Sequence, residues 1–263
     1  MEPMKRIKRK FLRTLLGVDP EYSDMFESVR EKFFAGLYLQ KIRDHFKEAF
    51  GEKRLAILDA GCQAGRLAIP LAKEGHHVTA VDTSPFALLR AKDHCKEEGV
   101  SVSFLRGDVA KILGKNAHSF DVILCLEVLY LREKYREFLD LFLKHLAPGG
   151  LLMVSHRTKF YYISLALKKN DLESALFVME HSEGKLWNSY FNWQTVEELK
   201  HLYREVGLSK VDLYPIGTFS EVLIDPQALP LEDRERLFRI ENEFPDERKG
   251  CARYILVCAR KPR

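Results

Sequence analysis

The spacing of apolar residues changes near residue 54. Between residues 21 and 50, apolar side chains fall mostly three or four positions apart, which predicts a helix. After residue 54, short runs rich in Val, Ile and Leu lack a clean polar–apolar alternation, and they predict strands buried on both faces of a sheet. The five runs are 55–60, 78–81, 102–105, 122–126 and 151–154.

Helical patterns separate these runs, at 66–73, 86–97 and 134–146. Strand–helix–strand repetition of this kind predicts right-handed crossovers and a parallel sheet. Beyond residue 193 the sequence predicts a helix at 195–206, a strand near 211–216 and a last strand at 254–259. The fold class is therefore α/β, with helices on both faces of a mostly parallel sheet.

Two stretches do not fit a minimal alternating sheet, and both are predicted to be insertions. They are 157–193, after the fifth strand, and 218–250, with a helix around 231–243. We therefore expect a helical N-terminal cap at 1–50 and one larger domain at 51–263.

The first insertion is rich in aromatic residues, including both tryptophans of the chain. Such a segment either forms a lid over an apolar ligand pocket or anchors itself to the sheet through its rings. The aromatic residues are Phe160, Tyr161, Tyr162, Phe177, Trp187, Tyr190, Phe191 and Trp193.

Charge is nearly balanced over most of the chain. The net charge is +4, but residues 1–16 alone carry six basic residues and one acidic residue. The near-neutral remainder does not favour a dedicated nucleic-acid-binding protein. The basic leader, with apolar residues interleaved, predicts either an amphipathic helix for an anionic membrane surface or RNA, or a solvated chain end. We favour the solvated end.

The cysteines and the hydropathy indicate a cellular location. Five cysteines occur without a Cys-x-x-Cys pair, so neither a disulfide framework nor a zinc site is predicted. No apolar run approaches the roughly 18 residues of a membrane span, and the N-terminus does not resemble a secretory signal. We expect a cytoplasmic protein with free thiols.

The turn after the first predicted strand is the first candidate for chemistry. Its sequence, from residue 58 to 65, is Leu-Asp-Ala-Gly-Cys-Gln-Ala-Gly, and a helix follows at once. Gly61 and Gly65 permit a tight turn and a close approach of a ligand to the main chain. Free amides at the start of a helix favour an anion. The alternative is a plain tight turn.

Two further acids follow strands. Asp82 ends the second strand, 23 residues after Asp59, where a carboxylate accepts hydrogen bonds from ribose hydroxyls. The alternative is a helix N-cap, for which Ser84 before a proline is already suited. Asp108 ends the third strand and either accepts from an adenine amino group or caps the next helix.

Two common nucleotide-binding motifs are missing. A dinucleotide fingerprint would require glycines at 61, 63 and 66, but the chain has Gln63 and Arg66. No Gly-Lys-Ser/Thr sequence of a phosphate-binding loop occurs either. Hydride transfer and phosphoryl transfer are therefore disfavoured.

The order of these motifs resembles class I S-adenosylmethionine-dependent methyltransferases. The resemblance covers about residues 54–157 and includes Asp59-x-Gly61-x-Gln63-x-Gly65, Asp82, Asp108, the run from Phe120 to Glu127, and Leu146 to Gly150. Gln63 departs from the glycine usual in the family. The resemblance implies a Rossmann-like sheet of seven strands with an antiparallel last strand. It also implies S-adenosylmethionine as cofactor and S-adenosylhomocysteine as product.

The resemblance also implies roles for individual residues. Asp59 and Gly61 would line the methionine end of the cofactor, and Gly65 would allow close packing of the helix. Asp82 would bind the ribose and Asp108 the adenine. Glu127 would lie near the methionine and the substrate, unless it is a surface acid at a helix end. Thr83, Leu105 and Val109 are candidate walls of the adenosine pocket.

Methyl transfer from a sulfonium needs alignment and exclusion of water more than it needs acid–base groups. A base is required only if the acceptor must lose a proton. His156, predicted at the end of the fifth strand, is a candidate base, although a lone histidine is more often structural. Tyr130 either faces the methyl group or packs beneath the following helix.

We expect a small-molecule methyltransferase of the group that includes quinone-pathway enzymes. Its acceptor is expected to be partly apolar or aromatic, with an oxygen or nitrogen nucleophile. One alternative is an RNA methyltransferase that uses the basic leader. Another is a non-catalytic module that only binds S-adenosylmethionine.

Overall fold

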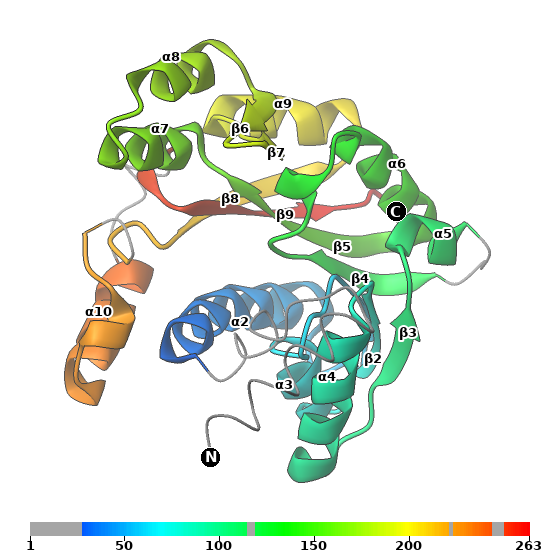
Figure 1. Ribbon diagram of the computed structural model, residues 1–263. Helices are drawn as coiled ribbons and strands as arrows, with labels where there is room; N and C mark the ends of the chain where they lie inside the picture. The colour runs from blue at the N-terminus through cyan, green and yellow to red at the C-terminus, as the bar shows by residue number, and fades with distance from the viewer. Residues whose placement is uncertain (1–27, 115–118, 221–222, 244–249) are drawn as a thin grey trace.

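A seven-stranded mixed sheet forms the centre of the computed structural model, which describes residues 28–114, 119–220, 223–243 and 250–263 (Figure 1). The strand order is β3-β2-β1-β4-β5-β9-β8, and only β9 runs antiparallel to its two neighbours. This arrangement confirms the predicted fold class. The strands are β1 (Ala56–Ala60), β2 (His77–Asp82), β3 (Ser103–Arg106), β4 (Phe120–Cys125), β5 (Leu146–Arg157), β8 (Ser209–Ile216) and β9 (Tyr254–Arg260).

The central strands are apolar on both faces because helices cover both. Successive side chains of a strand point to opposite faces, so Ile57 contributes to one core and Leu58 to the other. The edge strand β3 differs from its prediction, since Leu105 and two of its neighbours are exposed. An edge strand lies at the margin of the covering helices, so an apolar run alone does not ensure its burial.

Strand β5 is longer than the sequence predicts. It begins directly after α6 (Tyr135–His145), so Pro148 and the two glycines that follow lie within it rather than before it. The pairing of β5 with β4 shifts register between Phe120 and Val122. Proline within a strand is tolerated at such an irregularity, where it need not donate to the ladder.

Helices pack in two layers on the sheet. α2 (Val29–Phe50), α3 (Ala68–Lys73) and α4 (Pro85–Glu98) contribute to the core on one face. α5 (Val109–Leu113), α6 and α9 (Val196–Glu205) contribute to the core on the other. In Figure 1 the dark blue α2 lies below the sheet and α9 above it. The helical cap predicted at residues 1–50 stays a prediction, because residues 1–27 lie outside the described residues; its described helix, α2, shares its core with the sheet.

The first insertion forms a small unit with its own core. It consists of α7 (Lys159–Lys168), α8 (Leu172–Glu180) and a hairpin of β6 (Glu183–Leu186) and β7 (Ser189–Asn192), beside α9 at the top of Figure 1. Tyr162 and Trp193 are buried at its centre, and the Trp193 indole donates to the carbonyls of Val178 and His181. The rings of the insertion therefore pack mostly on one another.

The second insertion contains α10 (Leu231–Glu243), with the bounds that the sequence predicts, and a short turn η3 (Pro226–Ala228). Phe238 of α10 meets Phe33 of α2 edge-on, with ring centres 5.8 Å apart. The Glu241 carboxylate accepts hydrogen bonds from the amides of residues 218 to 220. These contacts attach the helix to the segment that follows β8.

Within the described residues, no helix combines the length and apolarity needed to cross a membrane. The basic leader at residues 1–16 lies outside the described residues, so the structure does not test the predicted contact with a membrane surface or RNA.

Candidate functional site

A cavity of about 460 Å³ lies at the carboxyl ends of the central parallel strands. Open α/β sheets bind their ligands at this edge, and cavities of this size accept small molecules. The predicted site residues that line it are Gly61, Asp82, Thr83, Val109, Glu127 and Tyr130.

The turn after β1 has the backbone that its glycines predict. Gly61 has a φ of 90°, and a Cβ at this position would overlap Cγ2 of Val128. Gln63, which departs from the family pattern, also adopts a left-handed backbone, with a φ of 50°. Its amide donates to Oδ2 of Asp82 over 2.8 Å. Glycine is usual at this position because only glycine adopts such a backbone without cost.

Asp82 is held at the mouth of the cavity by two backbone amides. Besides Gln63, the Ser84 amide donates to its Oδ1 over 2.8 Å. The helix that follows is capped by the Ser84 side chain, which accepts from Ala87, and begins with a proline. The half-buried carboxylate of Asp82 keeps lone pairs for a ligand hydroxyl.

Besides Leu105, a candidate pocket wall on the edge strand, three predicted cofactor residues do not line the cavity. Asp59 is 2% exposed, and within the described part of the chain its Oδ2 has no hydrogen-bond partner. Burial raises the pKa of Asp59 to about 7. Gly65 supports helix packing, since a Cβ there would lie 2.8 Å from Ile69 and 3.4 Å from Ala91.

Asp108 is the third of these residues, and its geometry matches the alternative of a helix cap. Its carboxylate accepts from the amide of Ala110 over 2.9 Å and caps α5. Its other oxygen lies 3.2 Å from Arg132, which lines the cavity. Val109 and Gly107 on either side of Asp108 do line the cavity, so the loop after β3 forms part of its wall.

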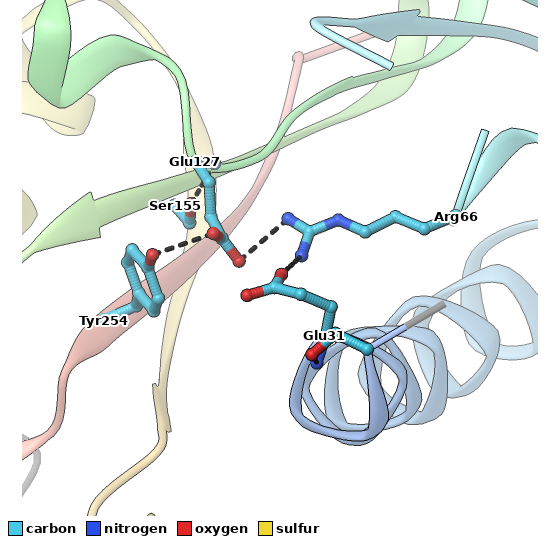
Figure 2. A network of polar contacts seen from close by, with 6 residues as sticks. Glu31, Arg66, Glu127, Ser155 and Tyr254 are labelled. Carbon is cyan, nitrogen blue, oxygen red and sulfur yellow. Dashed lines mark hydrogen bonds and ion pairs between the residues drawn. The ribbon is translucent and has the colours of Figure 1, made fainter. Parts of the chain in front are cut away.

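A buried network of charges lies along one wall of the cavity (Figure 2). Arg66, from the turn after β1, is 2.7 Å from Glu31 of α2 and 2.8 Å from Glu127. The Tyr254 hydroxyl of β9 donates to the other oxygen of Glu127 over 2.8 Å. Arg66 and Glu31 were not predicted as site residues, because only the fold brings α2 against this turn.

Glu127 is a buried acid and not the surface residue of the alternative prediction. Its side chain is 13% exposed, and its amide donates to Ser155 over 2.6 Å (Figure 2). Burial opposes ionisation, but Arg66, Arg253 and Arg157 outweigh it and lower the pKa of Glu127. The group is therefore an anion that orients cations and not a ready base.

The prediction of His156 as a base is corrected by its position. His156 is fully buried, does not line the cavity, and hydrogen-bonds to Gln194 and Tyr203, at 3.2 and 2.8 Å. Burial lowers the pKa of His156 to about 4, so the ring is neutral near pH 7. Strand alternation explains the error: His156 faces the core below α9, whereas the next residue, Arg157, points to the opposite face of the sheet and lines the cavity.

Two buried arginines in the lining of the cavity were missed by the sequence analysis. Arg157 and Arg253 both line the cavity, among the rings of Tyr254 and Tyr161. Arg157 directly follows His156, so the strand-end argument applied to it equally. Because β5 is buried on both faces, no alternation in its sequence showed which residue faces the ligand.

The aromatic residues of the first insertion are not among the described residues that line the cavity. Among the described residues that line it, Arg157 is the only member of 157–193. Tyr161 comes near indirectly, with its ring 4.2 Å from the Arg157 guanidinium. The rings therefore match neither the predicted lid over the cavity nor the alternative of anchoring to the sheet, because they pack mostly on one another.

The lining fits S-adenosylmethionine. The chain approaches closely at Gly61, where a side chain has no room, and Asp82 offers a carboxylate to a hydroxyl pair. Glu127 supplies a negative charge between Gly61 and Asp82 on one side and the arginines on the other. Val109 and Phe86 supply apolar walls. An adenosine joined to a charged amino-acid chain matches this succession of polar and apolar surfaces.

Comparisons with known proteins agree with this geometry. A family described as a methyltransferase domain matches residues 57–150. A ubiquinone biosynthesis O-methyltransferase of Rickettsia felis is 33% identical over 127 residues, which are 48% of this chain and 50% of that protein. The chain thus matches about half the length of this curated relative.

Solved structures share the whole fold. The plantazolicin methyltransferase BpumL in complex with S-adenosylhomocysteine aligns over 99% of this chain and 100% of its own, with a TM-score of 0.62 and 17% identity. The magnesium protoporphyrin IX methyltransferase of Synechocystis PCC 6803, with the same ligand bound, aligns over 98% and 99%, with a TM-score of 0.59 and 14% identity. At these identities the likeness shows the fold. Together with the family match, it identifies a class I S-adenosylmethionine-dependent methyltransferase domain in this chain.

Proposed function

We propose that this protein transfers the methyl group of S-adenosylmethionine to an oxygen or nitrogen atom of a small-molecule acceptor. The observation that carries the proposal is the cavity at the ends of β1, β2 and β4. Gly61, Asp82 and Glu127, predicted from the sequence as cofactor residues, lie together in its lining. The names of the matched relatives support an O-methyltransferase and small-molecule acceptors.

In this proposal Asp82 binds the ribose hydroxyls, and Val109 and Thr83 flank the adenine. Gly61 lies against the methionine part, and Glu127 orients its ammonium group. When bound, S-adenosylmethionine supplies a methyl group on a positively charged sulfur that leaves as a neutral thioether. The protein therefore needs mainly to align the acceptor and to exclude water.

Few groups in the cavity are placed to remove a proton from the methyl acceptor. Glu127 is held as an anion by arginines, and His156 lies on the other face of the sheet. Tyr130 is buried and lines the cavity, where its hydroxyl is available to hydrogen-bond an acceptor. The proposal keeps Tyr130 as a residue that orients the acceptor, and it assumes a cytoplasmic location, where the free cysteines persist.

The two other functions predicted from the sequence differ from this one in testable ways. An RNA methyltransferase would depend on residues 1–16, which lie outside the described residues. A binding module would hold the cofactor without turnover. Release of S-adenosylhomocysteine with an acceptor separates catalysis from binding alone.

Calorimetric titration with S-adenosylmethionine, S-adenosylhomocysteine and NAD tests the cofactor site. We expect the first two ligands to bind and NAD not to bind. Asp82→Ala removes hydrogen bonds to a charged acceptor and should weaken binding about 10- to 100-fold. The folded state should be retained in thermal melting.

Asp93→Ala is the matched control, because the half-buried Asp93 of α4 lies outside the cavity lining and pairs with Lys96. Its affinity should equal that of the wild type. An unchanged affinity in the Asp82 variant would contradict the assignment of the ribose site, and tight binding of NAD would contradict the choice of cofactor.

A further inference from the structure

We propose that Arg157 binds a carboxylate of the methyl acceptor, so that the substrate is a small apolar or aromatic acid. This inference rests on the proposed function and concerns the part of the same cavity that the cofactor residues leave. Arg157 ends β5, next to Tyr254 on β9, and lines the cavity.

Within the described residues, the buried Arg157 guanidinium forms no ion pair of its own. The residue is 7% exposed, and within the described part of the chain its Nε and Nη1 have no hydrogen-bond partner. Ring faces surround it instead: its Cζ lies 4.0 Å from the ring centre of Tyr254, 4.2 Å from Tyr161 and 4.9 Å from Tyr130.

A buried guanidinium whose donors are unsatisfied is stabilised by binding an anion. Taking a guanidinium out of water costs free energy unless its donors are hydrogen-bonded, and cation–π contacts leave those donors unsatisfied. The acid beside it, Glu127, already has one oxygen against Arg66 and the other against Tyr254. A planar carboxylate is the natural partner of an arginine fork, because it accepts two parallel hydrogen bonds.

The position of Arg157 favours the acceptor over the cofactor as the source of this carboxylate. With the ribose at Asp82 on β2, the ends of β1 and β4 lie between it and β5. Three strand spacings, about 14 Å, separate the ends of β2 and β5. The methionine part thus falls at Gly61 and Glu127, and Arg157 lies beyond it.

The charges of the residues that line the cavity also favour an anionic acceptor beside Arg157. Arg66 lies between Glu31 and Glu127, so these three groups leave one negative charge against the two positive charges of Arg157 and Arg253, while Arg132 faces Asp108. Arg253 lies close to Arg157 through the shared rings of Tyr161 and Tyr254, and both residues lower the pKa of Glu127. This end of the cavity is therefore cationic with aromatic walls, which suits an anion on an apolar body.

The test uses the full-length protein saturated with S-adenosylhomocysteine. The probes are benzoate, 2-naphthoate and octanoate, each paired with its neutral amide and measured by calorimetry. We expect at least one acid to bind tenfold or more tightly than its amide. Arg157→Gln should abolish that preference, and Arg157→Lys should retain part of it. Arg136→Gln, on an exposed arginine paired with Glu205, should leave it unchanged.

Acids that bind no better than their amides, or no binding by any acid, would overturn the proposal. A second arm identifies the source of the carboxylate with S-adenosyl-3-thiopropylamine, which is S-adenosylhomocysteine without its carboxylate. If Arg157→Gln weakens S-adenosylhomocysteine tenfold but leaves this analogue unchanged, Arg157 holds the cofactor and the proposal is wrong. Failure of the wild type to bind S-adenosylhomocysteine would instead contradict the proposed function.

Discussion

Two residues beside the cavity, Gln63 and Glu127, adopt left-handed backbone conformations although neither is glycine, with φ values of 50° and 61°. Such conformations cost about 1–3 kcal/mol and persist only where other contacts hold them. Here the amide of Gln63 donates to Asp82, and that of Glu127 donates to Ser155. Other non-glycine residues of the described chain, such as Asn170 and Lys210, adopt this backbone away from the cavity, but Gln63 and Glu127 are the two that form part of its wall.

Asp59 offers a test at the scale of the residue. Its folded pKa of about 7 lies above its usual value of 3.8 because the group is buried. Between about pH 4 and pH 7 the folded protein keeps a proton that the unfolded chain has lost. The contribution of Asp59 to stability is therefore complete below about pH 4 and is lost as the pH rises through about 7.

We expect Asp59→Asn to remove this dependence. The free energy of unfolding of the variant, minus that of the wild type, should rise by up to about 1.4 kcal/mol per pH unit between pH 4 and 7 and then level off. Urea titrations at four pH values measure this difference, with Asp93→Asn, at a half-buried acid, as the control. A difference that stays constant with pH would show that Asp59 ionises normally.

At the scale of the element, helices begin at caps that are visible in the sequence. Thr195 and Glu198 form a reciprocal capping box at the start of α9, and Ser84 caps α4. Both helices match their predicted ranges within two residues. Their agreement with prediction has a local cause, since cap, first turn and apolar spacing all lie within a few residues of one another.

Thr195→Ala should lower the free energy of unfolding by about 1 kcal/mol, because it leaves an amide of the first turn of α9 without its acceptor. Thr195→Ser keeps the hydroxyl and should therefore retain most of the free energy of unfolding that Thr195→Ala loses. Since Thr195 lies outside the cavity lining, neither change should alter the affinity for S-adenosylhomocysteine. Equal stability of all three proteins in urea would show that the cap does not contribute.

At the scale of the whole molecule, the network of Figure 2 joins segments that are far apart in the sequence. Glu31 belongs to α2, Arg66 follows β1, Glu127 follows β4 and Tyr254 begins β9. A buried ion pair needs every partner in place, because removing one leaves an uncompensated charge. The network therefore couples the packing of α2 to the shape of the cavity.

Glu31→Gln tests that coupling. In this variant Arg66 keeps its ion pair with Glu127. We therefore expect a loss of about 2–3 kcal/mol in the free energy of unfolding, typical of a hydrogen bond to a charged group. The matched control is Glu74→Gln, which breaks a surface pair with Arg43 and should cost less than about 1 kcal/mol. Equal losses in the two variants, measured by urea unfolding, would mean that burial adds nothing to the inner pair.

Much of the candidate site follows from short-range signals. Gly61, Asp82 and Glu127 each end a strand, and the carboxyl ends of parallel strands meet at one edge, so their convergence could be predicted. Asp108 remained ambiguous because a strand-end acid suits a ligand and a helix cap equally. Only the completed loop shows that its carboxylate is used as a cap.

The sequence by itself determined the order of strands and helices, the turn after β1 and the acids at the strand ends. Each of these depends on the period of apolar residues, on glycine or on caps, which act over a few positions. The tertiary structure alone decided that Arg157, and not His156, lines the cavity, and that Glu31 meets Arg66. A strand buried on both faces has no polar side to mark its orientation, and contacts across 35 residues depend on how the layers pack.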